Sequence, residues 1–326
     1  MRRSLSVLAA CVAAALLVAL VGCAVPAAEK KEQVSGAQAS TAQASGAQTA
    51  SEQTYRERLE SCANQIRAIS DFKPEVVVVL GTGLGGFVDD LDVKATIPYA
   101  DIEGWPASTA PEHAGNLVLA EYHGHRLAVM QGRIHYYEGY SMEEVVLPMR
   151  VLHKLGANTA ILTNAVGSMN PEFRVGEFVC VRDQISSFIP SPLIGQNIDE
   201  LGDRFVGMTG AFDQELQDTV LRVGGEKGIP VHSGVYIEVT GPQYETPAEI
   251  AMYRSLGADT IAMSMADEVL AARHMGMKVC AINCISNMAA GMEEEGFSEE
   301  SIGESMKQAA QNLRTLLDGL VSSLSA

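Results

Sequence analysis

Short apolar segments alternate with helical patterns along most of this chain, and this alternation restricts the fold more than any other feature of the sequence. The apolar segments occupy residues 76–80, 127–130, 160–163, 178–181, 234–239, 260–263 and 278–284. Helical patterns occupy residues 55–70, 142–155, 213–227, 247–255, 267–275 and 298–324. Strands that alternate with helices are typical of an α/β domain with a central, buried sheet.

The first residues have the layout of an export signal. Arg2 and Arg3 precede an apolar stretch at residues 5–21, and this stretch ends in LVGC, which resembles the lipobox of bacterial lipoproteins. We therefore expect residues 1–22 to be a lipoprotein signal peptide and Cys23 to be lipidated. The protein would then be exported and anchored to a membrane, at the cell surface or on the periplasmic face. The alternative is a plain signal peptide or membrane anchor with an incidental Cys23, because the stretch is near the short limit of about 20 residues for a span.

Residues 23–54 are predicted to form a flexible tether. They contain the run AQASTAQASGAQTASEQ, which is rich in Ala, Gln, Ser and Gly and has few large apolar residues. Such a composition cannot bury a core. The folded domain is therefore expected to comprise residues 55–326.

Charge and cysteine content argue against two further classes of protein. The formal net charge is −17, which disfavours nucleic-acid binding because that function needs a basic face. A disulfide framework is not expected either, because Cys11 lies in the signal and four other cysteines lie in apolar segments. We expect those four to be buried free thiols: Cys62, Cys180, Cys280 and Cys284.

A glycine-rich turn follows the first apolar segment, in VVVVLGTGLGG at residues 76–86. Gly81, Gly83 and Gly86 fit the G-x-G-x-x-G pattern of dinucleotide-binding domains. That pattern requires a crossover helix, but only about two helical turns separate the glycines from the β-like residues KATI. The turn is better suited to a single phosphate, which its N–H groups and the Thr82 hydroxyl can bind.

The motif GRIHYYEG follows the segment at 127–130. If the backbone stays extended, Arg133, His135 and Tyr137 share one face, where a guanidinium, an imidazole and an aromatic ring suit a phosphate and a sugar. Each residue taken alone also has an ordinary interpretation: a surface ion pair, a core histidine and a packing residue.

Three further motifs follow predicted strands. TNAVG is predicted to leave its strand in a turn of small residues, whose N–H groups suit an anion. In TGPQYETPAEI, Thr246, Pro247 and Glu249 form a capping box, so that Glu245 lies just before a helix. Ser264 lies where a strand passes into a helix, which is another natural anion site.

In this order the motifs resemble the trimeric family of purine nucleoside phosphorylases, through LGTGLG, HAG, GRIHYYEG, TNAVG, GPQYETPAE, AMS and ISN. The resemblance extends from about Tyr55 to the C-terminus. It implies a single α/β domain with a central mixed β-sheet flanked by helices, and a homotrimer. It also implies phosphorolysis of inosine and guanosine to purine base and ribose 1-phosphate, with inorganic phosphate as co-substrate and no cofactor or metal.

The resemblance also implies the residues of the site. The phosphate would be bound by Thr82, His113, Arg133, His135, the backbone N–H of Ala165 and Ser264. The nucleoside would be bound by Tyr137, Tyr244, Glu245, Met263 and Asn287, and the catalytic residues would be His135, Glu245 and Asn287.

The chain departs from the family at three places, where it has SEE at 298–300, MADE at 265–268 and RDQIS at 182–186. At the first, many members have a histidine for the ribose 5′-hydroxyl, and Glu299 leaves that recognition open. One alternative is therefore an exported nucleoside-binding lipoprotein with weakened catalysis. Another is a phosphorylase of other purine nucleosides such as methylthioadenosine, and the nicotinamide-dependent dehydrogenase is the third.

Overall fold

The computed structural model describes residues 42–110, 113–293 and 299–325 of this chain. The predicted signal peptide, Cys23 and the tether up to residue 41 lie outside the described residues. Residues 45–326 form one compact unit.

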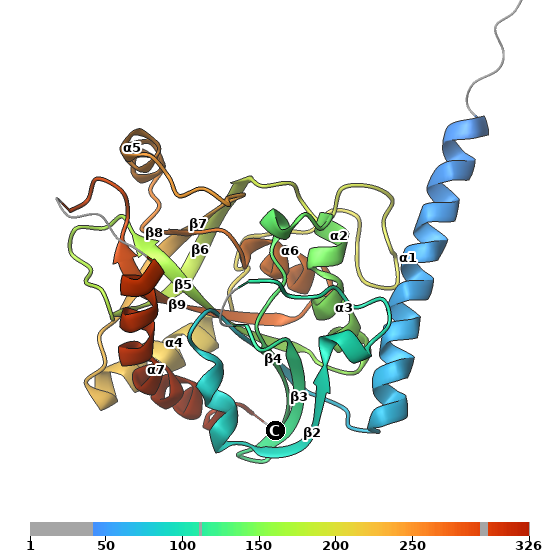
Figure 1. Ribbon diagram of the computed structural model, residues 1–326, viewed down its shortest axis with the longest axis horizontal. Helices are drawn as coiled ribbons and strands as arrows, with labels where there is room; N and C mark the ends of the chain where they lie inside the picture. Colours follow the sequence, from blue (N-terminus) through green and yellow to red (C-terminus); the bar gives the residue numbers. More distant parts are fainter. Residues whose placement is uncertain (1–41, 111–112, 294–298, 326) are drawn as a thin grey trace, which may run out of the picture. The chain divides into compact units, whose positions relative to one another are not determined.

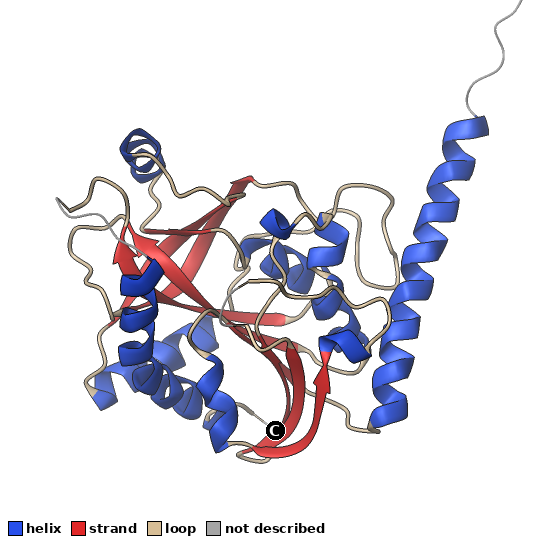
Figure 2. Ribbon diagram, in the orientation of Figure 1, coloured by secondary structure: helices blue, strands red, loops and turns tan. Residues whose placement is uncertain are grey.

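Strand β1 (Val76–Leu80) lies between two apolar cores, because its successive side chains point to opposite faces of the sheet. Val77 and Val79 face a core shared with α1 (Ala42–Ile69), α2 (Met142–Val145), α3 (Leu147–Lys154) and α6 (Ala266–His274). Val76, Val78 and Leu80 face a core shared with α4 (Gln214–Lys227) and α7 (Glu299–Ser322). The sheet therefore has helices on both faces (Figures 1 and 2).

The sheet is mixed, and part of it closes on itself. Its order is β2-β3-β4-β1-β5-β8-β7-β6-β9, and β9 pairs with β5 as well as with β6. Strands β5 to β9 thus form a closed ring. The remaining elements are β2 (Asp92–Pro98), β3 (Asn116–Tyr122), β4 (His125–Gln131), β5 (Thr159–Ser168), β6 (Phe178–Phe188), β7 (Val231–Val239), β8 (Thr260–Ala262), β9 (Lys278–Met288) and α5 (Pro247–Ser255). The predicted fold class is confirmed.

The predicted elements differ from the structure most clearly at three places. Helix α1 begins at Ala42 instead of near Tyr55, so the predicted tether is helical from residue 42; alanine and glutamine are good helix formers and extend a helix that Tyr55 and Leu59 anchor in the core. The helix predicted at 142–155 is divided into α2 and α3, because Pro148 has no N–H to continue the first. Strands β2 and β3 were not among the predicted strands; β2 is largely exposed and carries charge.

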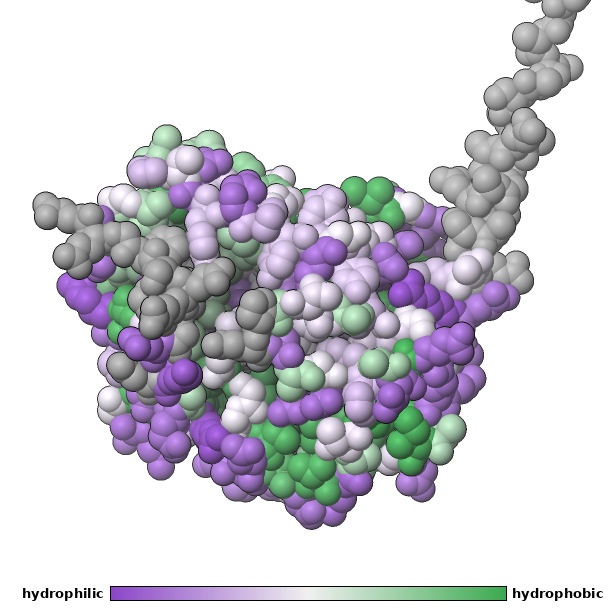
Figure 3. Space-filling model, viewed as in Figure 1, coloured by the Kyte–Doolittle hydropathy of each residue, from purple (hydrophilic) through white to green (hydrophobic). Residues whose placement is uncertain are grey.

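The thiols and the surface agree with the composition. Cys62, Cys180, Cys280 and Cys284 are free and buried, as predicted. Hydrophilic residues dominate the face in Figure 3, where hydrophobic residues form separate patches. Within the described part of the chain, none of the helices combines the length and the apolar character that crossing a membrane requires.

Candidate active site

A cavity of about 300 Å³ lies beside the C-terminal parts of β5, β8 and β9 and the glycine turn after β1. This volume is within the range of small-molecule sites. Its lining residues are Thr82, Ala110, His135, Tyr137, Asn164, Ala165, Val166, Gly167, Tyr244, Glu245, Ile261, Ala262, Met263, Ser264, Ser286 and Asn287. The structure therefore brings together nine of the eleven residues that the motifs singled out, and the two that do not line the cavity are His113 and Arg133.

Strand register explains why distant segments meet here. Gly167 in β5 lies opposite Ile261 in β8 and Asn287 in β9. A Cβ atom at Gly167 would come within 3.3 Å of Asn287 Nδ2. The absence of a side chain at this position gives the Asn287 amide its place in the cavity.

Hydrogen bonds fix the orientation of the Asn287 amide. Ser286 Oγ donates to Asn287 Oδ1 at 2.8 Å, and Asn287 Nδ2 donates to Met288 O at 3.1 Å. One hydrogen of the Nδ2 group and one lone pair of Oδ1 remain for a ligand. Glu245 lines the same cavity, and burial raises the pKa of its carboxyl group. This part of the site thus offers an oriented amide and a carboxylate.

Three rings form a stack beside the cavity. The His113 and His135 ring centroids lie 5.2 Å apart, and those of His135 and Tyr137 lie 4.6 Å apart. Burial, followed by the charges of His135 and Arg133, lowers the pKa of His113 to about 4, and burial lowers the pKa of His135. Both imidazoles are therefore neutral at neutral pH.

Glu138 holds His135 in one tautomer, a role that the sequence motifs did not indicate. Its Oε1 atom lies 2.8 Å from His135 Nδ1 and accepts from His135 N at 2.8 Å. Burial raises the pKa of Glu138, but hydrogen bonds from His135 and Thr109 outweigh it and hold that pKa at about 2. Because a carboxylate only accepts, Nδ1 carries the proton and Nε2 is an acceptor. The three-residue spacing from His135, as in a capping box, was the available signal.

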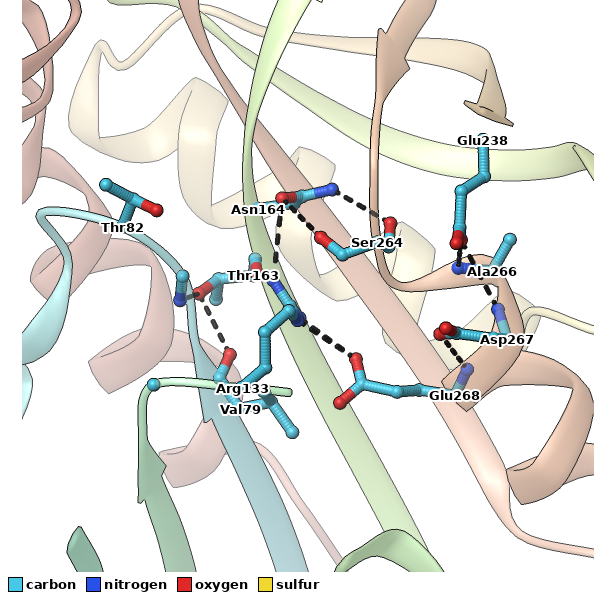
Figure 4. A network of polar contacts seen from close by, with 12 residues as sticks. Val79, Thr82, Arg133, Thr163, Asn164, Glu238, Ser264, Ala266, Asp267 and Glu268 are labelled. Carbon is cyan, nitrogen blue, oxygen red and sulfur yellow. Dashed lines mark hydrogen bonds and ion pairs between the residues drawn. The ribbon is translucent and has the colours of Figure 1, made fainter. Parts of the chain in front are cut away.

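Arg133 does not face the cavity, so the prediction of one shared face for Arg133, His135 and Tyr137 is wrong. Strand β4 ends at Gln131 and a turn of 3-10 helix follows at Tyr136–Glu138, so the period of two is lost. The guanidinium is buried, and its Nε and Nη2 atoms donate to Glu268 Oε2 at 3.2 and 3.0 Å (Figure 4). A buried guanidinium needs a charged partner, and Glu268 supplies it.

Arg133 reaches the cavity wall through Asn164. Its Nη1 atom donates to Thr163 O at 2.7 Å and to Asn164 Oδ1 at 3.4 Å. Ser264 Oγ donates to the same Asn164 oxygen at 3.4 Å. Asn164 thus connects Arg133 to Ser264, and no pattern in the sequence distinguished it from its neighbours in TNAVG.

The predicted turn at TNAVG is absent from the described structure, because strand β5 continues to Ser168. Ala165 pairs with Cys284 in β9, and the register shifts between Val166 and Gly167. A β-bulge in the middle of a paired strand, not a turn, therefore shapes this wall.

The N-terminus of α6 is also occupied by a group from the protein. Glu238 Oε2 accepts from Ala266 N at 2.5 Å and from Asp267 N at 3.4 Å (Figure 4). The acceptor at this helix end is thus an internal carboxyl group. Burial raises the pKa of Glu238 well above its usual range, followed by the charge of Asp267.

Asp267 provides a test of this cluster through pH. Burial and then the Glu268 charge raise the pKa of Asp267 from 3.8 to about 7. The folded state therefore keeps a proton that the unfolded state loses, and stability falls as pH rises from about 4 to about 7. Asp267→Asn should remove this loss, which amounts to at most about 4 kcal/mol. In thermal melts, the melting temperature of the variant minus that of wild type should be larger at pH 8 than at pH 5. An equal difference at both pH values would contradict this.

The departure at residues 298–300 lies at the start of α7. Helix α7 begins at Glu299. Ser298 and the side chains of Glu299 and Glu300 lie outside the described residues.

Comparisons with known proteins agree with this geometry. The family model described as "Phosphorylase superfamily" matches residues 75–322. Purine nucleoside phosphorylase 1 of Bacillus subtilis is 39% identical over 267 residues, which are 82% of this chain and 98% of that protein. The purine nucleoside phosphorylase of Bos taurus is 37% identical over 279 residues, which are 82% of this chain and 95% of that protein.

Solved structures of purine nucleoside phosphorylases also resemble this chain. The purine nucleoside phosphorylase of Schistosoma mansoni in complex with inosine superimposes with a TM-score of 0.78 at 32% identity, over 83% of this chain and 97% of that one. The resemblance inferred from the seven motifs is confirmed. With a family model covering 75–322 and relatives matched over nearly their whole length, the chain belongs to the phosphorylase superfamily, among the relatives of purine nucleoside phosphorylases.

Proposed function

We propose that this protein cleaves the 6-oxopurine nucleosides inosine and guanosine by phosphorolysis, to give the purine base and ribose 1-phosphate. The observation that carries the proposal is the composition of one cavity. It holds Thr82, His135 and Ser264, which suit a phosphate, together with Glu245 and Asn287, which suit a purine edge. Relatives support the substrate class, because solved Schistosoma phosphorylases contain inosine and guanosine, and another solved purine nucleoside phosphorylase contains ribose 1-phosphate.

In this reaction the bond between the purine and the anomeric carbon breaks, and its electron pair moves to the purine. An oxygen of phosphate then forms the new bond to that carbon through an oxocarbenium-like state, as in glycoside cleavage. The enzyme needs no cofactor because the second substrate is itself the nucleophile. Holding phosphate and nucleoside together makes the attack effectively intramolecular.

His135 orients the phosphate as an acceptor. Its Nδ1–H is bonded to Glu138, so its Nε2 lone pair accepts a hydrogen bond from the hydroxyl group of a hydrogen phosphate ion. The Thr82 and Ser264 hydroxyls lie in the same cavity, and the Ser264 hydroxyl can turn from Asn164 Oδ1 to donate to the phosphate. On the purine, the free Asn287 N–H stabilises the charge that develops during departure, and loss of such a donor costs about a hundredfold in rate.

The decisive experiment incubates the purified protein with inosine, with and without phosphate, and measures hypoxanthine and ribose 1-phosphate. Phosphate-dependent release of both products supports the proposal. Binding of inosine without product would favour the nucleoside-binding lipoprotein. Methylthioadenosine in the same assay tests the second alternative. Because one solved Schistosoma mansoni relative contains adenosine, turnover and not binding must be compared.

Assembly as a homotrimer is part of the proposal. Ile194 and Phe205 are 71% and 90% exposed, and such apolar side chains suit a contact between subunits. Sedimentation analysis of the full-length protein should give three times the monomer mass, and a monomer at all concentrations would contradict this.

The proposed location is a membrane surface, reached through a lipid on Cys23. If Cys23 is the acceptor, wild-type protein should partition into detergent, whereas Cys23→Ser should stay in the aqueous phase or remain unprocessed. Cys11→Ser is the matched control and should behave as wild type. Equal partitioning of wild type and Cys23→Ser, with the signal intact, would indicate a simple anchor.

A further inference from the structure

The turn between β8 and α6, residues 263–265, carries Ser264 into the cavity with an unusual backbone. Met265 has φ 96°, a left-handed backbone conformation that residues other than glycine rarely adopt. Two side chains of the sheet donate hydrogen bonds to the carbonyl oxygen of Ser264. They are the Tyr236 hydroxyl in β7 and the Asn164 Nδ2 atom in β5, the latter at 3.2 Å.

Side chains of the sheet also form hydrogen bonds with the backbone of Ala266 and Asp267. Gln184 in β6 donates from Nε2 to Ala266 O at 3.2 Å. Glu238 in β7 accepts from Ala266 N at 2.5 Å and from Asp267 N at 3.4 Å. Met265 is the N-cap residue of α6 and makes no side-chain cap bond. Glu238 therefore supplies from a neighbouring strand the cap that the helix does not have in its own sequence.

We propose that Glu238 is a positioning residue of the phosphate site: its carboxyl group caps α6, keeps Met265 in its left-handed conformation, and thereby holds Ser264 in the cavity. The proposal rests on the phosphorolysis proposed above, because it concerns the same site. The connection is covalent and short, since only Met265 lies between Ser264 and the capped residue Ala266.

Charge argues that Glu238 is more than a filler of the core. Glu238 is 1% exposed, and the buried carboxyl groups of Asp267 and Glu268 lie in the same helix turn. Burying one more carboxyl group beside two others is unfavourable, and an apolar residue of similar volume would fill the space at lower cost. The two hydrogen bonds to α6 are the gain that an apolar residue cannot supply.

The test compares Glu238→Met, which removes the acceptor, with Glu238→Gln, which keeps an oxygen at the same distance along the side chain. Glu238→Met should raise the KM for phosphate about tenfold to hundredfold, the range for small displacements of a positioned group, with the KM for inosine changed less than about threefold. Glu238→Gln should have a phosphate KM near that of wild type. Glu238→Asp, whose carboxyl group is too short to reach the helix, should resemble Glu238→Met.

A matched control separates position from stability. Val220 is fully buried in α4, on the other face of the sheet, and Val220→Ala should lower the melting temperature without changing the phosphate KM. The inference is overturned if Glu238→Met and Glu238→Asp leave the phosphate KM unchanged, if they raise both KM values alike, or if Val220→Ala has the same effect.

A second measurement distinguishes this inference from the proposed function. The rise in melting temperature caused by inorganic phosphate alone is measured for wild type and the Glu238 variants, without nucleoside. A wild type that binds phosphate but does not cleave inosine would refute the function, while a smaller phosphate-induced rise in Glu238→Met would still support the inference. An equal rise in both proteins would overturn it.

Discussion

Arg133→Met should lower the free energy of unfolding by about 3–5 kcal/mol, the cost of leaving a buried charge without its partner. The Arg133 and Glu268 side chains are 1% and 5% exposed, and their closest atoms lie 3.0 Å apart. The variant leaves the Glu268 carboxyl group in the core without a cation. Urea denaturation monitored by fluorescence gives the loss directly.

The size of this effect depends on burial, and a second ion pair provides the control. Arg222 and Glu226 form a pair on α4 whose side chains are 51% and 56% exposed. Arg222→Met should cost less than about 1 kcal/mol, because water solvates the remaining carboxylate. Adding Glu268→Gln to Arg133→Met should recover part of the stability. A loss below about 1 kcal/mol in Arg133→Met would show that the buried pair contributes little.

The same variant should impair catalysis through Asn164, because Arg133 donates to the amide oxygen that also receives the Ser264 hydroxyl. The sequence motifs and the family resemblance predicted a direct contact between Arg133 and phosphate. In the structure its guanidinium donates four hydrogen bonds, all to protein atoms. We therefore expect a higher phosphate KM from a displaced Asn164 and Ser264, with little change in the KM for inosine.

Local patterns predicted most of the fold. Buried strands such as Val76–Leu80 and capped helices such as Pro247–Ser255 have signals within a few residues, and the structure has them with these bounds. Strand β2 was indicated only by its β-like residues KATI and was not among the predicted strands, because it is mostly exposed and pairs only with β3. Pairing with β3 determines the position of β2, and the hydrophobic pattern of the sequence does not predict such pairing.

The site was predictable as a set of residues but not as a set of contacts. Motifs identified Thr82, His135 and Asn287, and these residues line one cavity. The partners of Arg133 could not be predicted, because Glu268 lies 135 residues away in the sequence. Likewise, the pairing of β7 with β8 places Glu238 next to α6. Pairing between distant charged groups follows from tertiary structure, whereas motif spacing reports neighbours along the chain.

The largest expected effect concerns the choice between purines. A carboxylate at Glu245 accepts hydrogen bonds, so it suits the protonated N1 of hypoxanthine and guanine and repels the lone pair on N1 of adenine. The Asn287 amide, fixed by Ser286 and Met288 O, can donate to a 6-oxo group and accept from a protonated N7. A site built to bond one edge rejects a mismatched edge by a factor of roughly 10⁴. Wild-type kcat/KM should therefore be about that much higher for inosine than for adenosine.

Asn287→Asp should reverse part of this preference, because an aspartate accepts from the 6-amino group of adenine. The variant also places an oxygen where Nδ2 donates to Met288 O, so inosine turnover should fall by about a hundredfold or more. The discrimination by wild type should weaken as pH falls, since burial raises the pKa of Glu245 and a protonated carboxyl group can donate to N1 of adenine. Measuring kcat/KM for both nucleosides from pH 5 to pH 8 tests both claims. Comparable cleavage of adenosine and inosine by wild type at pH 7.5 would refute the roles of Glu245 and Asn287, even if phosphorolysis itself were established.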